Sequence, residues 1–235
     1  MITAQPGLAH ALVDLAVLDI AGTTVEEHGA VYTALEDAVV AAGGRPGRSD
    51  IEQWMGADKH EAVTALLRAG HDRDAAPAAA TVQATYADFT ARLNRAYADK
   101  PPVPMEGVPE ALAALRSRGV KVALTTGFTR DVTRPILRSI GWEHGLIAAV
   151  ITVDEVAAGR PAPYMIFHAM ERAGVSDVAR VLVAGDTVRD LQAGVNAGAG
   201  FVVGVLTGGH DATVLGAVRH THLLPGVRDI PALVL

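Results

Sequence analysis

The chain has 235 residues, of which 50% are hydrophobic and 20% charged, so it can build a core and is not disordered. Its 26 acidic and 20 basic residues give a net charge of −6, and aromatic residues make up only 4%. Both features argue against nucleic acid as a partner. Because there is no cysteine, disulfides, thiolate zinc sites and cysteine nucleophiles are excluded. The length fits one main fold with a sizeable insertion.

The beginning of the chain does not resemble a secretory signal. No lysine or arginine precedes Arg45, and Asp14 and Asp19 interrupt the early apolar stretch. The uncharged segment 191–209 contains polar residues and many glycines, which favours a helix end and a buried strand over a membrane span. We therefore expect a cytoplasmic protein that does not contact membranes. The sequence does not decide the oligomeric state, and a homodimer is one possibility.

Short apolar runs alternate with helical patterns along most of the chain. Runs that are apolar throughout and rich in β-branched residues are typical of strands buried on both faces of a parallel sheet. Five such runs predict strands at Leu15–Ile20, Val120–Thr125, Ala148–Val153, Val181–Ala184 and Phe201–Leu206. The intervening patterns predict helices, among them 129–141, 163–173 and 187–197. This order predicts an α/β fold with a doubly wound parallel sheet.

The region from Ala30 to Ala98 breaks the alternation, because it contains only helical patterns. Several features indicate separate helices: a shared apolar face of Val31, Leu35, Ala38 and Ala42, capping boxes at Ser49–Glu52 and Asp58–Glu61, and a long helix from Pro77 to Tyr97. A proline-rich hinge follows. The predicted domains are therefore an α/β core made of residues 1–28 and 105–235, and a helical cap, 29–104, inserted after strand 1.

Carboxylates stand at the ends of two predicted strands. Asp19 ends the first strand and precedes a turn with Gly22 and Thr23, and Asp186 follows the fourth strand, with Asp190 one helical turn further on. Ligands bind beyond the carboxyl ends of strands in an open parallel sheet. Carboxylates beside an anion-binding turn suit Mg²⁺ and a phosphate-containing substrate. Taken singly, either strand-end aspartate is more often an N-cap than a catalytic group, and a surface position remains open for Asp190.

Two further strand ends carry hydroxyl groups and a cation. Thr125, Thr126 and Gly127 end the second strand, and Arg160 follows the third. An arginine here could bind phosphate in a bidentate manner and orient Asp19. Alone, Thr125 reads as an ordinary strand residue and Arg160 as a solvated loop charge. All four strand ends together indicate an active crevice.

These strand ends resemble the four motifs of the haloacid dehalogenase superfamily, namely DIAGT (19–23), LTT (124–126), GRPAP (159–163) and GDTVRD (185–190). A helical cap after the first motif is also that superfamily's pattern. The resemblance implies that Asp19 attacks phosphorus and becomes an aspartyl phosphate. It implies a Mg²⁺ cofactor held by Asp19, the Ala21 carbonyl and Asp186, with Asp190 in support. Thr125 and Arg160 would steady the phosphoryl group, which the residues Gly22, Thr23, Thr126 and Gly127 would help to bind.

The chain departs from the superfamily's phosphatases at Ala21, where they usually carry a second aspartate that protonates the leaving group. DxAGT resembles the phosphonatase branch, which contains phosphonoacetaldehyde hydrolase. That branch cleaves a carbon–phosphorus bond after a cap lysine forms an iminium with the substrate aldehyde. The segment Met55-Gly56-Ala57-Asp58-Lys59 matches the branch's Met-Gly-x-x-Lys spacing. The resemblance therefore implies Lys59 as the Schiff-base residue.

The position of Lys59 is unusual on physical grounds as well. If Asp58 is an N-cap, Lys59 stands in the first helical turn, where the macrodipole disfavours a cation and lowers the lysine pKa. The alternative is a solvated surface lysine. The branch also carries a histidine where this chain has Ala62, and commonly a tyrosine where it has Phe128. His60 and Met55 are our candidates for contacting the substrate, although Met55 could equally belong to the core.

Other functions remain open at this point. A small phosphonate or phosphorylated metabolite is the expected substrate, and a phosphomonoester phosphatase of the same superfamily is the main alternative. A receiver-like phosphoacceptor and a non-catalytic binder also use an aspartate in an α/β fold. A dinucleotide site is disfavoured, because the glycine-rich stretch 194–200 ends a helix rather than opening one.

Overall fold

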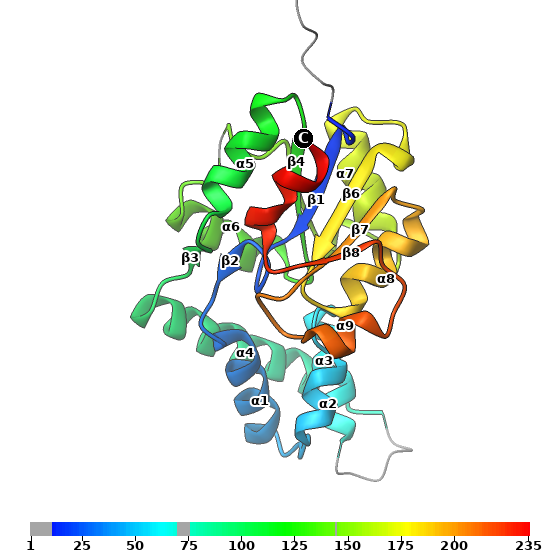
Figure 1. The fold of residues 1–235 in the computed structure, drawn as a ribbon. Helices are drawn as coiled ribbons and strands as arrows, with labels where there is room; N and C mark the ends of the chain where they lie inside the picture. Colours follow the sequence, from blue (N-terminus) through cyan, green and yellow to red (C-terminus); the bar gives the residue numbers. More distant parts are fainter. Residues whose placement is uncertain (1–10, 70–75, 144) are drawn as a thin grey trace, which may run out of the picture.

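The computed structural model describes residues 11–69, 76–143 and 145–235, and its centre is a parallel sheet of six strands. The first ten residues of the expected core segment lie outside the described residues. The strand order is β5-β4-β1-β6-β7-β8, and every neighbouring pair in this sheet is parallel. The strands are β1 (Leu15–Asp19), β4 (Lys121–Thr126), β5 (Ala149–Thr152), β6 (Val181–Gly185), β7 (Phe201–Val205) and β8 (His222–Leu224). The prediction of a parallel α/β sheet is confirmed (Figure 1).

Helices cover both faces of the sheet, which explains why its strands are apolar throughout. Successive side chains of a strand point to opposite faces. Ala16 and Leu18 of β1 belong to one core cluster, and Leu15 and Val17 belong to another. The first cluster includes residues of α5 (Val108–Ser117), α6 (Arg130–Ser139) and α10 (Ile230–Val234); the second includes residues of α7 (Tyr164–Ala173) and α8 (Val188–Ala197). A short helix, α9 (Ala212–Gly216), precedes β8.

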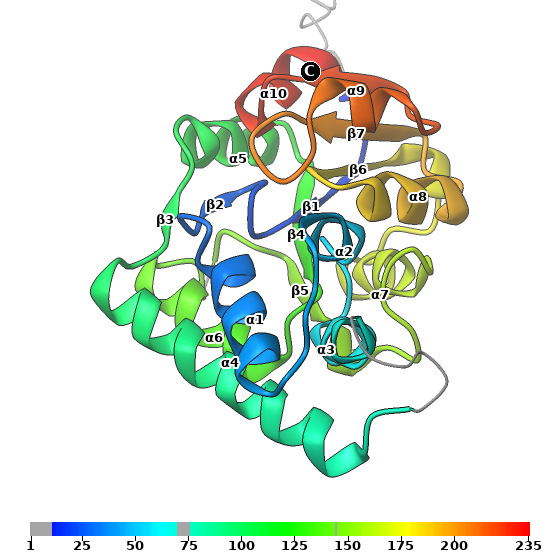
Figure 2. The same ribbon diagram turned by 90° about the horizontal axis from the view of Figure 1, so that it is seen from below.

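Four helices form a cap beyond the carboxyl ends of the strands (Figures 1 and 2). They are α1 (Ala30–Ala41), α2 (Arg48–Gln53), α3 (Lys59–Arg68) and α4 (Ala79–Asp99). The chain enters the cap through β2 (Val25–Glu26) and leaves it through β3 (Val103–Pro104), and these two strands pair antiparallel. The cap is therefore tied to the core by a short two-stranded ribbon, which the sequence analysis did not predict.

The ends of the cap helices show where local signals succeeded. Asp58 is the N-cap of α3, as predicted, and its side chain accepts hydrogen bonds from the amides of His60 and Glu61. The capping box predicted at Ser49 is wrong, because Gly47 is the N-cap of α2 and its amide donates to the side chain of Asp50 at 2.8 Å. Within the described ranges, no helix is both long and apolar enough to cross a membrane.

Candidate active site

The sheet brings the strand ends together at the face that the cap covers. Asp19 is the last residue of β1, and it lies in register with Thr125 of the neighbouring strand β4. Asp186 directly follows β6, the neighbour of β1 on its other side. Because all three strands are parallel, their carboxyl ends open into one crevice. The residues that the sequence analysis assigned to different motifs are therefore neighbours in space.

Arg160 joins three of these groups through one buried guanidinium. Its Nη2 atom donates to Asp19 Oδ1 at 2.6 Å and to Thr125 Oγ1 at 3.0 Å, and its Nη1 atom lies 2.6 Å from Asp190 Oδ1. Arg160 is 4% exposed and Asp190 is 3% exposed. The alternatives of a solvated loop arginine and a surface aspartate are therefore wrong. The planar guanidinium fixes the orientation of the Asp19 carboxylate.

Asp190 makes its second set of contacts at the start of α8. The N-cap of this helix is Thr187, not Asp186, and the Thr187 amide donates to Asp190 Oδ2 at 3.1 Å. Asp190 thus uses one carboxylate oxygen for the helix cap and the other for Arg160. This arrangement holds Arg160 in place, and Asp186 does not cap the helix.

Asp186 lies in a cradle of small residues. Thr23 Oγ1 donates to its Oδ1 atom at 2.7 Å, and the Gly209 amide donates to its Oδ2 atom at 2.6 Å. A Cβ atom at Gly22 or Gly208 would lie 2.6 Å or 2.1 Å from Asp186 Oδ2, so neither position accepts a side chain without movement. Gly22 also has a φ of +83°, which favours glycine. The 207–209 loop was not predicted, although two adjacent glycines after a strand were a usable signal.

The electrostatics of the crevice fit a divalent cation. Burial is the main cause that raises the pKa of Asp19 to about 8; the charge of Arg160 opposes this change, and the charges of Asp190 and Asp186 add to it. Burial and the charge of Asp190 likewise raise the pKa of Asp186 to about 6. Three buried carboxylates thus face one ion-paired guanidinium, and a bound cation would keep Asp19 and Asp186 ionised.

The donor set for that cation would be mixed. In the described part of the chain, no group of three or more His, Cys, Asp or Glu side chains is arranged to hold a metal. A magnesium ion would therefore need the backbone carbonyl of Ala21, in the turn after β1, beside the carboxylates of Asp19 and Asp186. Because both Asp190 oxygens contact other groups, we place Asp190 behind this set, where it positions Arg160.

A loop of the cap packs directly onto the core crevice. A Cβ atom at Gly127, in the core, would lie 2.5 Å from the carbonyl oxygen of Ala57 in the cap. One at Gly56 would lie 2.4 Å from Thr187 Oγ1, and one at Gly209 would lie 2.9 Å from the sulfur of Met55. The cap loop and the core therefore meet so closely that a side chain at Gly127 or Gly56 would force the structure to shift.

Lys59 reaches the crevice from the cap and is only 4% exposed. Its Nζ atom donates to the Ala57 carbonyl at 2.9 Å and lies 5.8 Å and 5.5 Å from the ring centres of Tyr32 and Phe128. Burial lowers the pKa of Lys59 to about 8, although the nearby charge of Asp19 opposes this change. The pKa falls as predicted, but its main cause is loss of solvent, and the alternative of a solvated lysine is wrong.

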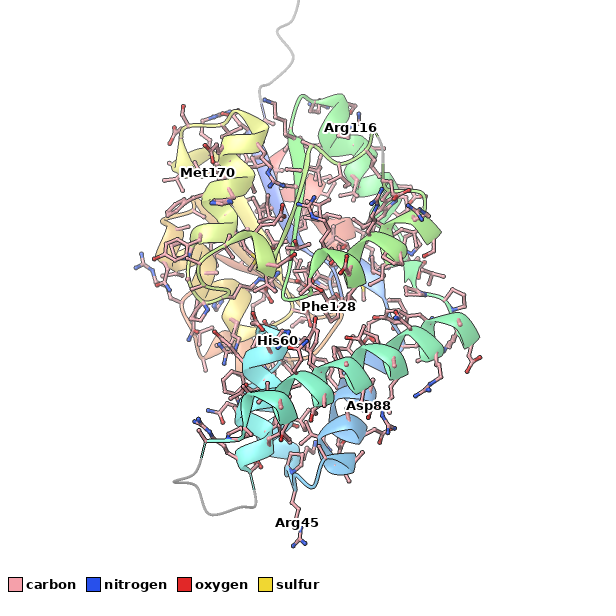
Figure 3. The ribbon with its side chains drawn as sticks, turned by 180° about the vertical axis from the view of Figure 1, so that it is seen from behind. Arg45, His60, Asp88, Arg116, Phe128 and Met170 are labelled. Carbon is pink, nitrogen blue, oxygen red and sulfur yellow. The ribbon has the colours of Figure 1, made fainter. Side chains whose placement is uncertain are left out.

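The remaining predicted contacts lie around the junction between cap and core, where Figure 3 labels His60 and Phe128. The His60 ring stacks on the ring of Tyr86 with centres 3.7 Å apart, and the Tyr86 hydroxyl lies 3.3 Å from Thr129 Oγ1 of the core. Thr126 Oγ1 accepts a hydrogen bond from the Phe128 amide at 3.2 Å. His60 thus supports the junction, and Thr126 shapes the loop after β4.

Two residues near the site were missed by the sequence analysis. Tyr32 of α1 accepts a hydrogen bond from the Gly56 amide at 3.4 Å. Arg189 of α8 lies 5.1 Å from the centre of the Trp54 ring and donates to the carbonyl oxygens of Arg160 and Gln53. Tyr32 belongs to no recognisable motif. Arg189 lies within the GDTVRD motif, but no signal in the sequence connects either residue to the cap loop.

Comparison with known proteins identifies the class. The family model of the haloacid dehalogenase-like hydrolases matches residues 13–198, which are most of the chain. The chain therefore belongs to the haloacid dehalogenase-like hydrolase family, and it is an enzyme. This finding confirms the predicted resemblance and sets aside the receiver-like phosphoacceptor.

More specific similarity points to one group of relatives. A phosphonoacetaldehyde hydrolase of Parabacteroides distasonis is 39% identical over 114 residues, which are 47% of this chain and 42% of that protein. One from Bacillus cereus is 35% identical over 132 residues, which are 56% of this chain and 49% of that protein. The match thus spans about half the length of these relatives or less.

Solved structures show the same fold. A phosphonoacetaldehyde hydrolase like protein from Oleispira antarctica matches with a TM-score of 0.79 at 21% identity, and the match covers 99% of this chain and 95% of that protein's chain. A predicted phosphoglycolate phosphatase from Haemophilus somnus has a TM-score of 0.74 at 17% identity, covering 94% and 98%. At these identities the likeness concerns the fold alone.

Proposed function

We propose that the protein is a magnesium-dependent hydrolase that cleaves the carbon–phosphorus bond of a small aldehyde phosphonate through an aspartyl phosphate and a Schiff base. The observation that carries the proposal is Lys59, a buried amine that the cap places within electrostatic reach of Asp19. The similarity to phosphonoacetaldehyde hydrolases over about half the chain supports the same substrate class.

Asp19 is the nucleophile of the proposed reaction. Its carboxylate oxygen attacks phosphorus in line with the bond to carbon, and Arg160 and Thr125 contact the phosphoryl oxygens. Asp19, Asp186 and the Ala21 carbonyl would hold a magnesium ion, which would supply positive charge for these oxygens. Water then hydrolyses the aspartyl phosphate and releases inorganic phosphate.

Lys59 supplies the electron sink that the carbon leaving group needs. Its free amine condenses with the aldehyde, water leaves, and the iminium accepts the electron pair of the breaking carbon–phosphorus bond. With a pKa of about 8, roughly a quarter of Lys59 is free amine at pH 7.5, against about 0.1% for a lysine near 10.5. Burial under the cap loop thus raises the reactive fraction more than a hundredfold.

A carbon leaving group also accounts for Ala21. An alkoxide leaving group needs a general acid, which typically contributes about 10²–10⁴-fold to the rate, and alanine cannot donate a proton. An enamine leaving group needs no acid at that position, because the iminium has already accepted the electron pair. Ala21 therefore favours the carbon–phosphorus bond over an ester.

A phosphomonoester phosphatase is the second candidate function. It is favoured by Ala62 and Phe128, which replace the histidine and tyrosine expected in the phosphonatase branch. In this candidate, the network of Asp19, Arg160 and Asp186 acts on an ester and Lys59 has no covalent role.

The deciding experiment measures phosphate release and covalent trapping together. Phosphonoacetaldehyde and a panel of phosphomonoesters are offered with Mg²⁺, with and without borohydride, which reduces an imine to a stable amine. We expect release from the phosphonate, inactivation by borohydride only with the aldehyde present, and a mass adduct on Lys59. Asp19→Asn should abolish release by at least about 10³-fold and leave trapping intact.

The matched controls are two conservative lysine variants. Lys59→Arg keeps the positive charge but cannot form an imine, so it should lose both trapping and turnover of the phosphonate. Lys100→Arg, at an exposed lysine, should behave as wild type. Ester turnover that survives in Lys59→Arg, without any trapping in wild type, would establish the phosphatase instead. A cytoplasmic location and a homodimer remain predictions.

A further inference from the structure

Tyr32 has no role in the proposed reaction, yet its ring lies near the amine of Lys59, the proposed Schiff-base residue. The residue comes from α1, and its oxygen accepts a hydrogen bond from the Gly56 amide at 3.4 Å. Lys59 donates to the carbonyl of the next residue, Ala57, at 2.9 Å. The phenol and the amine therefore hold consecutive residues of one loop, and the amine lies 5.8 Å from the centre of the Tyr32 ring.

The phenol also lies close enough to two carboxylates of the core for their charges to act on it. The negative charges of Asp186 and Asp19 act on it and, together with burial as the main cause, raise the pKa of Tyr32 well above its usual value. Tyr32 is thus within electrostatic reach of both aspartates while it flanks the lysine. A substrate whose phosphorus lies at Asp19 and whose carbon is bound to Lys59 would pass close to this hydroxyl.

The hydrogen-bonding state of Tyr32 defines what it can do. Its oxygen already accepts from Gly56, so its own proton is available for donation. The raised pKa keeps that proton on the oxygen, which excludes service as a base at neutral pH. Tyr32 can therefore act as a neutral hydrogen-bond donor.

Among the described residues, two aromatic rings lie near the Lys59 amine, and of these only Tyr32 carries a hydroxyl. Phe128 lies 5.5 Å from Nζ and offers no donor, and Ala62, on the same helix as the lysine, has no polar side chain. An aldehyde oxygen next to Lys59 would gain negative charge as the amine attacks, and a hydrogen-bond donor would stabilise that charge. Of these three residues, only Tyr32 can supply one.

We propose that Tyr32 donates a hydrogen bond to the carbonyl oxygen of the substrate and so selects phosphonates that carry an aldehyde. This inference rests on the proposed function. The Lys59 nitrogen forms a bond to the carbonyl carbon, the π electrons move to the oxygen, and a proton passes from nitrogen to that oxygen. A second proton, delivered from solvent, lets the oxygen leave as water, and the iminium forms. Tyr32 keeps its own proton throughout.

The test compares Tyr32→Phe with Tyr86→Phe in the whole 235-residue chain. Both variants keep the ring, and Tyr86 is the matched control because its hydroxyl contacts Thr129 of the core across the same junction. The measurement is the rate of borohydride trapping with phosphonoacetaldehyde as a function of pH. Calorimetry with inorganic phosphate and Mg²⁺ reports on the phosphate end of the site.

We expect Tyr32→Phe to trap about 10²-fold more slowly at every pH, with the midpoint of the pH profile unchanged and phosphate binding intact. Tyr86→Phe should stay close to the wild-type rate. A shifted midpoint, or lost phosphate binding, would mean that Tyr32 merely positions the loop and would overturn the inference.

The two proposals fail in different ways. If wild type traps the aldehyde and Tyr32→Phe traps it equally fast, the role of Tyr32 is refuted while the proposed function stands. If wild type is not trapped at all, the proposed function fails and the role of Tyr32 fails with it.

Discussion

Replacing Lys59 by methionine should make the protein more stable while removing its activity. Lys59 is the one buried lysine of the three in the sequence, and burial lowers its pKa from 10.5 to about 8. A difference of that size corresponds to a penalty on the order of 3 kcal/mol for the charged form in the folded state. Methionine has a similar length, is apolar and adapts to irregular surroundings, so it should fill the space without this penalty.

The pH dependence of this gain follows from proton binding. Between pH 8 and 10.5 the unfolded chain keeps the Lys59 proton that the folded protein has lost, so the stability contributed by this group rises with pH across that window. Below pH 8 the penalty is fully present. The groups that act on the Lys59 charge are Asp19, Arg160, Asp58 and Arg189. We therefore expect Lys59→Met to gain roughly 3 kcal/mol at pH 7, and the gain to shrink toward zero near pH 10.5.

The gain in unfolding free energy is measured by urea unfolding of wild type and Lys59→Met at a series of pH values between 6.5 and 10. At neutral pH the expected gain corresponds to a rise of roughly 6–12 °C in Tm. Lys100→Met, at an exposed lysine, serves as the control and should change stability by less than about 0.5 kcal/mol. A Lys59→Met protein that is less stable than wild type, or a gain that does not vary with pH, would refute the assignment of Lys59 as a desolvated amine.

Two further variants test the junction and the packing of the cap. Arg189→Lys keeps the charge but loses the planar group that stacks on Trp54. We expect KM, measured by steady-state kinetics, to rise, and the stability, measured by thermal melting, to change by less than about 0.5 kcal/mol. An unchanged KM would contradict this prediction. Tyr97→Phe removes a buried hydroxyl that has no hydrogen-bond partner among the described residues, so stability should rise by about 1 kcal/mol, or roughly 2–4 °C in Tm. Tyr86→Phe, whose hydroxyl has a partner, should show no such gain, and a Tyr97→Phe protein that melts below wild type would contradict the reasoning.

The sheet was predictable because its strands are buried on both faces. Each of the five predicted runs overlaps an observed strand, since continuous apolar β-branched stretches have few other stable arrangements. The strand ends were predictable for the same reason. Once parallel strands are adjacent, residues such as Asp19 and Asp186 must share an edge, whatever their separation in sequence.

The ribbon of β2 and β3 could not be predicted from local patterns. Each strand has two residues, and β3 ends at Pro104, which cannot donate to a ladder. Their pairing depends on the return of the chain after the whole cap, so no short window contains the information. Ser49 illustrates a different failure, because its spacing to Glu52 imitated a capping box although the helix begins two residues after Pro46.

The least predictable contacts are those that depend on how the cap sits on the core. Motif spacing identified Lys59, and a helix-terminus argument gave the correct direction for its pKa, but burial between Tyr32 and Phe128 is the larger cause. That burial requires α1, α3 and the loop after β4 to converge, and the geometry is set by packing between elements far apart in sequence. Chemistry at strand ends is thus encoded locally, whereas the reactivity of Lys59 is a property of the assembled junction.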